Sequence, residues 1–294
     1  MEARGEAGFV PYGEMTRPHK TRRFIRRNPT MVAGGLLLAL MLVLATCAPY
    51  LFTVNPVEMN PVERLRAPGG GHWFGTDMYG RDSYSRVVYG SRISLFVGLV
   101  VAALTSGIGL TIGLISGFVR KLDNPIMRVM DGIMALPELL LAIAFVALTK
   151  ASVRNVIIAL VIPQTPRVVR LVRGIVLVLR EQPFVESALA MGARLPRLLL
   201  RHLLPNTIAP LVAQGTYVMA SAVLIEAGLS FLGAGTPPEI PSWGNIMAEA
   251  RPYFQLKPWM VLLPGLFLAV TVLAINLVGD GLRDMLDPRL ARNM

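Results

Sequence analysis

Long runs without a charged side chain constrain this sequence more than any other feature. An α-helix needs about 20 apolar residues to cross a bilayer. Four uncharged runs meet that length, at 31–52, 93–119, 203–225 and 258–278. A fifth run, 132–149, contains one ionisable residue, Glu138. The pattern predicts a chain that crosses a membrane several times.

A sixth span, the weakest, begins near Asn155. Its apolar opening is short, and its second half places Arg167, Arg170 and Arg173 on one helical face. We expect its cytoplasmic half to project beyond the lipid. The six spans predict an all-α, polytopic membrane bundle. Hydrophobic residues form 53% of the chain and charged residues only 16%, which excludes an ordinary soluble domain.

The formal net charge of +11 does not indicate nucleic-acid binding, because the basic residues alternate with uncharged runs. Cytoplasmic loops of membrane proteins are enriched in Lys and Arg. Placing both termini inside assigns 20 of the 29 basic residues to cytoplasmic segments. The polar first 30 residues also predict no cleavable signal peptide.

The sequence divides into the following segments: a basic cytoplasmic tail (1–30), a first span (31–52), a periplasmic loop (53–91), a transmembrane core (92–281) and a second tail (282–294).

The second span contains Gly109, Gly113 and Gly117 at a spacing of four residues. Small residues at this spacing let two membrane helices approach closely. Packing inside this bundle is the expected use, and association with a partner subunit is the alternative.

The stretch 181–206 is amphipathic and divided by prolines. Pro183 can begin a helix and Gly192 can end it. A second helix is expected to begin at Pro196 and to run into the next span after Pro205. An interfacial helix lying among lipid headgroups is one interpretation. A contact surface for a partner is the other.

The residues of this stretch resemble the EAA loop of binding-protein-dependent ABC importer permeases. The matching positions are Glu186-Ser187-Ala188, Gly192 and His202-Leu203-Leu204-Pro205, with serine in place of the middle alanine. Four further segments are similar to the dipeptide, oligopeptide and nickel subfamily, in the same order: 72–98, 123–144, 228–251 and 276–290.

The resemblance implies a type I ABC importer permease, a multi-pass protein of the bacterial inner membrane with no catalytic residues. Residues 183–202 would form the coupling helix that seats in a separate ATPase. The implied ATPase-coupling residues are Glu186, Ser187, Ala188, Gly192, Arg194 and His202. Ala188 and Gly192 would let the partner surface come close. Arg201 is expected to contact membrane lipid phosphate instead.

The resemblance also implies a second, homologous permease subunit, two ATP-binding subunits or domains, and a periplasmic or lipid-anchored solute-binding protein. The chain has no phosphate-binding loop, so ATP and Mg²⁺ would bind to the partner subunits and no cofactor to this chain. The implied substrates are di- or oligopeptides. Nickel chelates and glutathione-like compounds are the alternatives.

Two outer segments have both a structural and a functional interpretation. Asp77, Arg81 and Asp82 lie in a glycine-rich turn that Asp–Arg pairs could lock, or that could contact the binding protein. Trp243 lies in the proline-rich loop 236–247, which could gate the path or dock the binding protein.

Glu138 follows Pro137 inside the third span, where a carboxylate should face the bundle interior or a water-filled cavity. It could line the substrate path or pair with a neighbouring polar group, and Asp131 is expected to be structural. A secondary transporter is the weaker alternative, because Glu138 is the only clear acid within a predicted span. The histidines His19, His72 and His202 are too scattered to predict a metal site.

Overall fold

The computed structural model describes residues 28–286. Helices form nearly all of the regular structure, and these residues contain no β-strand, only two isolated bridges. The all-α prediction is confirmed. Most of the two predicted tails, together with His19, lies outside the described residues.

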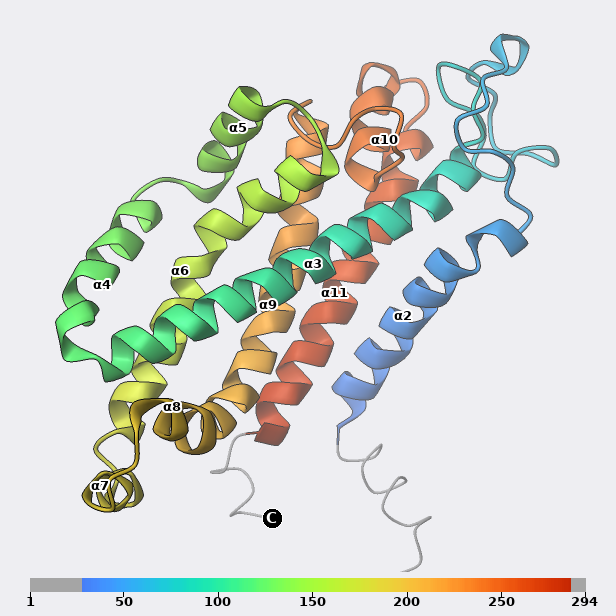
Figure 1. Ribbon diagram of the computed structural model, residues 1–294. Helices are drawn as coiled ribbons and strands as arrows, with labels where there is room; N and C mark the ends of the chain where they lie inside the picture. The colour runs from blue at the N-terminus through green and yellow to red at the C-terminus, as the bar shows by residue number, and fades with distance from the viewer. Residues whose placement is uncertain (1–27, 287–294) are drawn as a thin grey trace, which may run out of the picture.

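Five helices are long and apolar enough to cross a membrane, and a bent pair of shorter helices makes a sixth candidate. The five long helices are α2 (Pro29–Thr46), α3 (Ser83–Phe118), α6 (Val153–Leu179), α9 (Leu204–Phe231) and α11 (Trp259–Leu286). Figure 1 shows α3 crossing in front of α6, α9 and α11, with α2 at one edge of the bundle.

The predicted third span, 132–149, is wrong as a single straight helix. Helix α4 (Arg120–Met134) and helix α5 (Glu138–Thr149) meet at an angle of 86°. Pro137 explains the break, because it lacks an amide hydrogen and disfavours helical geometry at Leu136. Glu138 therefore begins α5, where the positive end of the helix dipole favours a carboxylate.

The glycines of α3 serve packing within this chain, as expected. Helix α3 packs along α6 more extensively than any other pair of helices. Gly109, Gly113 and Gly117 face Val168, Val172 and Val176 of α6. A Cβ atom at any of the three glycines would lie within 2.7 Å of a valine side-chain atom. These glycines therefore set how closely the two helices approach.

The predicted fourth span is one continuous helix of 27 residues, α6, in spite of Pro163 and Pro166. Among the candidate spans it has the largest buried share, 61% of its most apolar 18-residue window. Its weak hydropathy signal has two sources. Polar side chains such as Gln164 are covered by protein, and the arginines Arg167 and Arg170 are half exposed.

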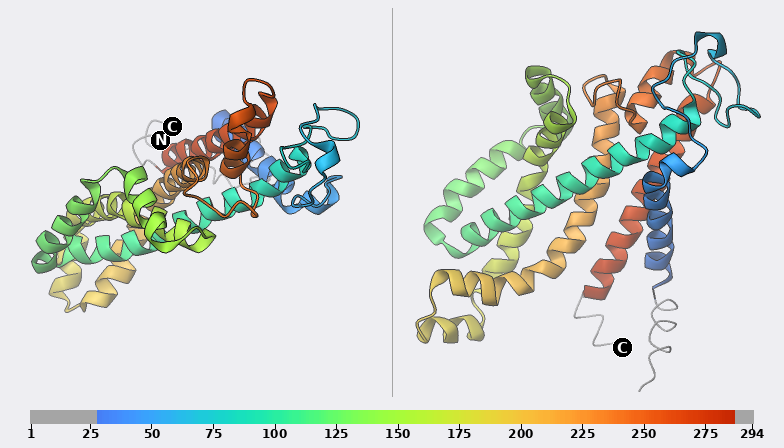
Figure 2. Two further views of the ribbon diagram at one scale, coloured as in Figure 1. Left: turned by 90° about the horizontal axis from the view of Figure 1, so that it is seen from above. Right: turned by 45° about the vertical axis from the view of Figure 1, so that its right-hand side comes forward.

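The short elements gather at the two ends of the bundle (Figures 1 and 2). One end carries α7 (Pro183–Ala190) and α8 (Leu195–Leu198), and we call it the α7 end. The other carries α10 (Trp243–Ala250) and the loop 47–82, and we call it the α10 end. The predicted irregular loop 236–247 is wrong over its last residues, because Ser242 caps α10 and accepts a hydrogen bond from the Asn245 amide.

Candidate functional site

Helix α7 begins and ends as the sequence predicts. Pro183 lies in its first turn, and Gly192 follows its end with a φ of +78°. The Ala193 amide donates to the Ala188 carbonyl at 3.0 Å, and the Gly192 amide donates to Leu189 at 2.9 Å. This pair of bonds is a Schellman motif, which requires the left-handed conformation that glycine adopts without strain. The motif turns the chain sharply from α7 toward α8.

The second helix of this region continues directly into a span. From Pro196 to Phe231 the chain is helical without interruption, through α8, the π-helical turn Leu199–Leu203 and α9. Pro205 accounts for the π-helical turn, because it has no amide hydrogen to give to the Arg201 carbonyl. The predicted helix, turn and helix at this end is confirmed.

The predicted coupling residues divide between exposed and buried positions. Glu186, Ser187, Gly192 and Arg194 are exposed, and His202 is half-buried with its ring 6.4 Å from that of Phe184.

Ala188 is buried, with only 3% of its surface exposed, and packs with Val185 into the main apolar core. The expectation that Ala188 meets a partner surface is therefore corrected. Its small side chain instead lets α7 lie close to the bundle.

Sequence reasoning missed the apolar tip of this region. Met191 is 82% exposed and Leu189 is 49% exposed, both beside the turn at Gly192. Large apolar side chains that project together from a polar surface are typical of a protein contact site. A methionine immediately before the glycine that ends an amphipathic helix was the available signal.

The arginines of α6 pair with acids of the bent helices. Arg173 donates two hydrogen bonds to Asp123, at 2.5 and 2.7 Å. Arg170 donates to Asp131 at 2.5 Å, and an Arg167 amino group lies 3.6 Å from a Glu138 carboxylate oxygen. We call these three pairs the ion ladder.

The ion ladder assigns the expected pairing role to Glu138 and the expected structural role to Asp131. The other Glu138 oxygen, Oε1, is buried and has no hydrogen-bond partner among the described residues. The acids are spaced by eight and seven residues, about two helical turns, which was the available sequence signal.

A buried cluster of charges lies at the α10 end, and we call it the outer cluster. Arg81 donates to Asp77 at 2.6 Å and to Glu249 of α10 at 2.5 Å. Arg86 donates to Glu249 at 3.0 Å and lies 3.7 Å from Asp77. The cluster therefore joins the loop 47–82, the start of α3 and α10.

The residues predicted to contact a binding protein are all buried in this region. Asp82 caps α3 by accepting from the Ser85 amide at 2.7 Å, and the Trp243 indole donates to the Val87 carbonyl at 3.0 Å. Asp77, Arg81, Asp82 and Trp243 present little surface. Their burial favours the structural interpretation of this turn.

Glu226 was also missed. It lies in α9, is fully buried, and accepts a hydrogen bond from Ser230 at 2.8 Å, with the Ser94 hydroxyl at 3.4 Å. The statement that Glu138 is the only acid within a span is therefore wrong. The predicted span stopped at Ile225 because a charge followed, although the helix continues to Phe231.

His72 bridges two carboxylates in the loop 47–82. Its Nδ1 atom lies 2.9 Å from Asp82 and its Nε2 atom 3.2 Å from Glu63. Burial lowers the pKa of His72, but the hydrogen bonds and negative charges of Asp82 and Glu63 outweigh it, so the pKa lies above the ordinary value. The protonated imidazole can donate to both carboxylates at once.

We expect this loop to become less stable as the pH rises. A raised folded pKa gives stabilisation that is complete below the unfolded pKa, about 6.5, and is lost as the pH rises through the folded value. Hydrogen exchange of the Gly69, His72 and Gly75 amides, corrected for intrinsic rates, should show progressively weaker protection over this range. In a His72→Gln variant these amides should be less protected at low pH than in the unmodified protein. Their protection should not change as the pH rises. Equal pH profiles for the two proteins would contradict the expectation.

Comparisons with known proteins agree with this architecture. The family of binding-protein-dependent transport system inner membrane components matches residues 109–292. A relative from Sinorhizobium fredii, named "Probable peptide ABC transporter permease protein", is 53% identical over 93% of this chain and 94% of its own length. The dipeptide transport system permease protein of Alkalihalophilus pseudofirmus is 40% identical over 90% of this chain and 88% of its own length.

Another relative and a solved structure extend the comparison. The glutathione transport system permease protein of Pectobacterium atrosepticum is 40% identical over 92% of this chain and 90% of its own length. The inward-facing MetNI methionine ABC transporter contains a chain that superposes with a TM-score of 0.57 at 21% identity. The match covers 68% of this chain and 96% of that one, and at this identity it supports the fold alone.

Proposed function

Because this chain belongs to the family of binding-protein-dependent transport system inner membrane components, we propose that it forms half of a path through which peptides enter the cell. As a member of this family it is a permease subunit of an ABC importer, works with ATPase subunits and is not itself an enzyme. Peptides are the proposed substrates because one relative at 53% identity is named a peptide permease and another at 40% identity a dipeptide permease.

The projecting apolar tip of α7 is the observation that carries the coupling role. The described residues leave Met191 mostly exposed and Leu189 half exposed, although Val185 and Ala188 of the same helix are buried. We infer that this tip enters a cleft in the ATPase, with Glu186 and Arg194 as polar contacts at its rim. ATP and Mg²⁺ would be bound by that partner, and the α7 end would face the cytoplasm of a bacterial cell.

The ion ladder supports the proposal that the substrate path runs beside α4, α5 and α6. The Arg167, Arg170 and Asp131 side chains are half exposed. Charged groups within a membrane bundle usually face protein or a water-filled cavity rather than lipid. The ladder surface of α4 to α6 would therefore line an aqueous cavity completed by a second permease subunit. Its alternating charges, and the unpaired Glu138 oxygen, suit a substrate that carries both an ammonium and a carboxylate group.

The coupling role predicts a severe transport defect for Met191→Asp. A charge placed in the apolar contact should reduce peptide uptake about tenfold or more, since 1.4 kcal/mol of lost contact energy already gives a tenfold change. The assay is uptake of a labelled dipeptide by proteoliposomes that contain both permease subunits, the ATPases and a peptide-loaded binding protein. ATP hydrolysis by the same vesicles should no longer respond to the loaded binding protein.

Met285→Asp is the matched control. Met285 is also an exposed methionine, at the end of α11 and away from α7. Uptake by this variant should stay close to that of the unmodified protein. If Met191→Asp transported normally, the coupling role of α7 would be refuted. If labelled glutathione entered while dipeptides did not, the coupling role would stand and the proposed substrate would be replaced.

A further inference from the structure

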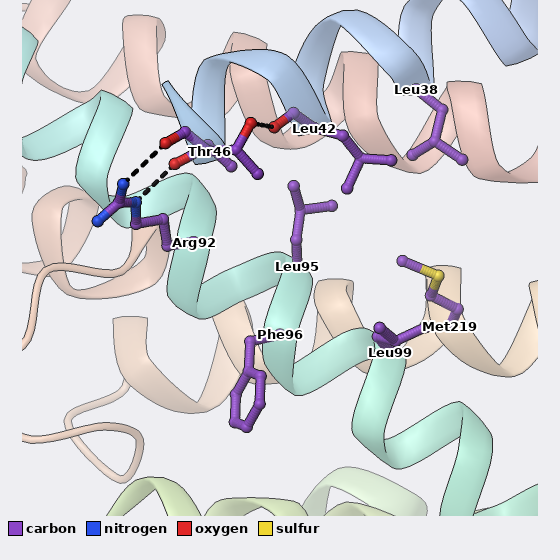
Figure 3. A pocket seen from close by; sticks show the side chains of 9 residues that line it. Leu38, Leu42, Thr46, Arg92, Leu95, Phe96, Leu99 and Met219 are labelled. Carbon is purple, nitrogen blue, oxygen red and sulfur yellow. Dashed lines mark hydrogen bonds between the residues drawn. The ribbon is translucent and has the colours of Figure 1, made fainter. Parts of the chain in front are cut away.

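An apolar groove runs between α2 and α3 on the outside of the bundle. It has a volume of about 590 Å³ and is lined mainly by large apolar side chains. Figure 3 shows Leu38 and Leu42 on one wall, Leu95, Phe96 and Leu99 on the other, and Met219 of α9 beside Leu99. Phe96 is 52% exposed and Leu99 is 59% exposed, so the described chain leaves about half of each side chain uncovered.

One end of the groove carries a positive charge. Arg92 lies where α2 ends, and its side chain donates to the carbonyls of Ala45 and Thr46 at 2.5 and 3.0 Å. Among residues 28–286 no carboxylate lies within ion-pair distance of Arg92, and its Nη1 amino group makes no hydrogen bond. Its positive charge is balanced only in part, by the carbonyls that end α2 and by the face of the Tyr89 ring 5.1 Å away. In a membrane this end of a span would lie near the lipid headgroups.

The walls of the groove fit a flexible chain better than another helix. Where helices of this protein pack closely, a glycine makes room, as Gly34 does against Leu277 and Gly98 against Val223. No glycine lines the groove, and its two small residues, Ala45 and Thr46, lie together at the end near Arg92. Membrane helices that pack closely usually need small residues at the contact. A lipid acyl chain can instead follow an uneven surface of leucine and phenylalanine.

We propose that this groove binds one phospholipid, with an acyl chain along Leu95 to Leu99 and the phosphate on Arg92. Guanidinium and phosphate form charge-assisted hydrogen bonds, and the free Nη1 group can donate one without breaking the bonds to α2. The lipid would fill the space between α2 and α3 and hold the end of α2 through the same arginine.

A second groove provides an internal comparison. The groove between α9 and α11 is also apolar, with Leu224, Leu268 and Leu273 on its walls, but no charged residue lines it. It should take up lipid chains without selecting for phosphate.

Photocrosslinking in the assembled transporter tests the proposal. The complex is reconstituted in vesicles of phosphatidylethanolamine that contain phosphatidylglycerol with a diazirine on its acyl chain, or diacylglycerol with the same group. Crosslinks from the phospholipid should concentrate on residues 92–99, and the diacylglycerol should give about tenfold fewer there, the effect of one bond to a charged group. At the α9–α11 groove the phospholipid and the diacylglycerol should give similar yields of crosslinks.

Two variants separate the phosphate contact from the apolar wall. Arg92→Gln keeps hydrogen-bond donors for α2 but should abolish the preference for phosphate. Leu99→Trp leaves Arg92 intact and should displace the acyl chain from the groove, whereas Leu273→Trp should change nothing at residues 92–99. Crosslinks spread evenly along the lipid-facing helices would overturn the proposal. The proposal would also be overturned if residues 92–99 gave no lipid crosslinks because the second permease subunit covers the groove. The occupant would then be a protein.

Discussion

Replacing Arg86 with methionine should destabilise this protein more than any other single change considered. Arg86 is only 1% exposed and lies between the carboxylates of Glu249 and Asp77. Removing one partner from a buried ion cluster usually costs about 3–5 kcal/mol, because the remaining charge stays buried without compensation. Burial already raises the pKa of Glu249, although Arg86 and Arg81 lie beside it. Without Arg86 the cluster would hold two carboxylates against the single charge of Arg81, so one negative charge would have to be protonated or rehydrated.

Thermal unfolding of the detergent-solubilised complex measures this loss. Arg86→Met should lower the unfolding temperature by about 10 °C, at about 2–4 °C per kcal/mol. Arg251→Met is the matched control, since Arg251 is exposed at the same end of the bundle, forms no ion pair among the described residues and lies over the face of the Phe231 ring. Adding Glu249→Gln to Arg86→Met should restore part of the stability. Equal unfolding temperatures for the two arginine variants would show that the outer cluster contributes little.

The second large effect is expected at the contact between α3 and α6. A Cβ atom at Gly113 would lie 2.6 Å from the Val172 side chain and 3.0 Å from the Val169 carbonyl oxygen. Gly113→Ala should therefore force the helices apart and destabilise the protein by about 1–3 kcal/mol, the usual range for overpacking. The measurement is again the unfolding temperature, together with the yield of assembled complex.

Gly107 gives a control within the same helix. A Cβ atom at Gly107 would meet nothing within 4 Å. Gly107→Ala should be neutral or stabilising, because alanine is the better helix former. A second change, Val172→Ala, should relieve part of the Gly113→Ala defect. If Gly113→Ala matched Gly107→Ala, the close approach of the two helices would not depend on Gly113.

The spans and the α7 region were largely predictable because each depends on local signals. Uncharged length identified the membrane helices, and Pro183 with Gly192 marked the limits of α7. Local signals also misled. A charge was taken as the end of a span at Ile225, yet Glu226 continues the helix because Ser230 and Ser94 surround its carboxylate.

The remaining features depend on pairs that lie far apart in the chain. Asp77 and Arg81 are four residues apart, so their pairing could be expected, but Glu249 reaches them from 168 positions away. The pairing of the α6 arginines with Asp123, Asp131 and Glu138 was not foreseen, because these acids lie on two helices whose bend the sequence did not show. The exposure of Met191 likewise depends on how α7 folds back on the bundle.

The helical stretch from Pro196 to Phe231 joins the two ends of the molecule without a non-helical residue, but it is not a straight rod. Figure 2 shows it bending between α8 and α9. The bend lies at the π-helical turn Leu199–Leu203 and Pro205, where the regular ladder of backbone hydrogen bonds is interrupted. Near the other end of α9, the Glu226 carboxylate is held by Ser230. A force applied at α7 would therefore first change the angle of this bend, and only then tilt the part of α9 that Glu226 anchors.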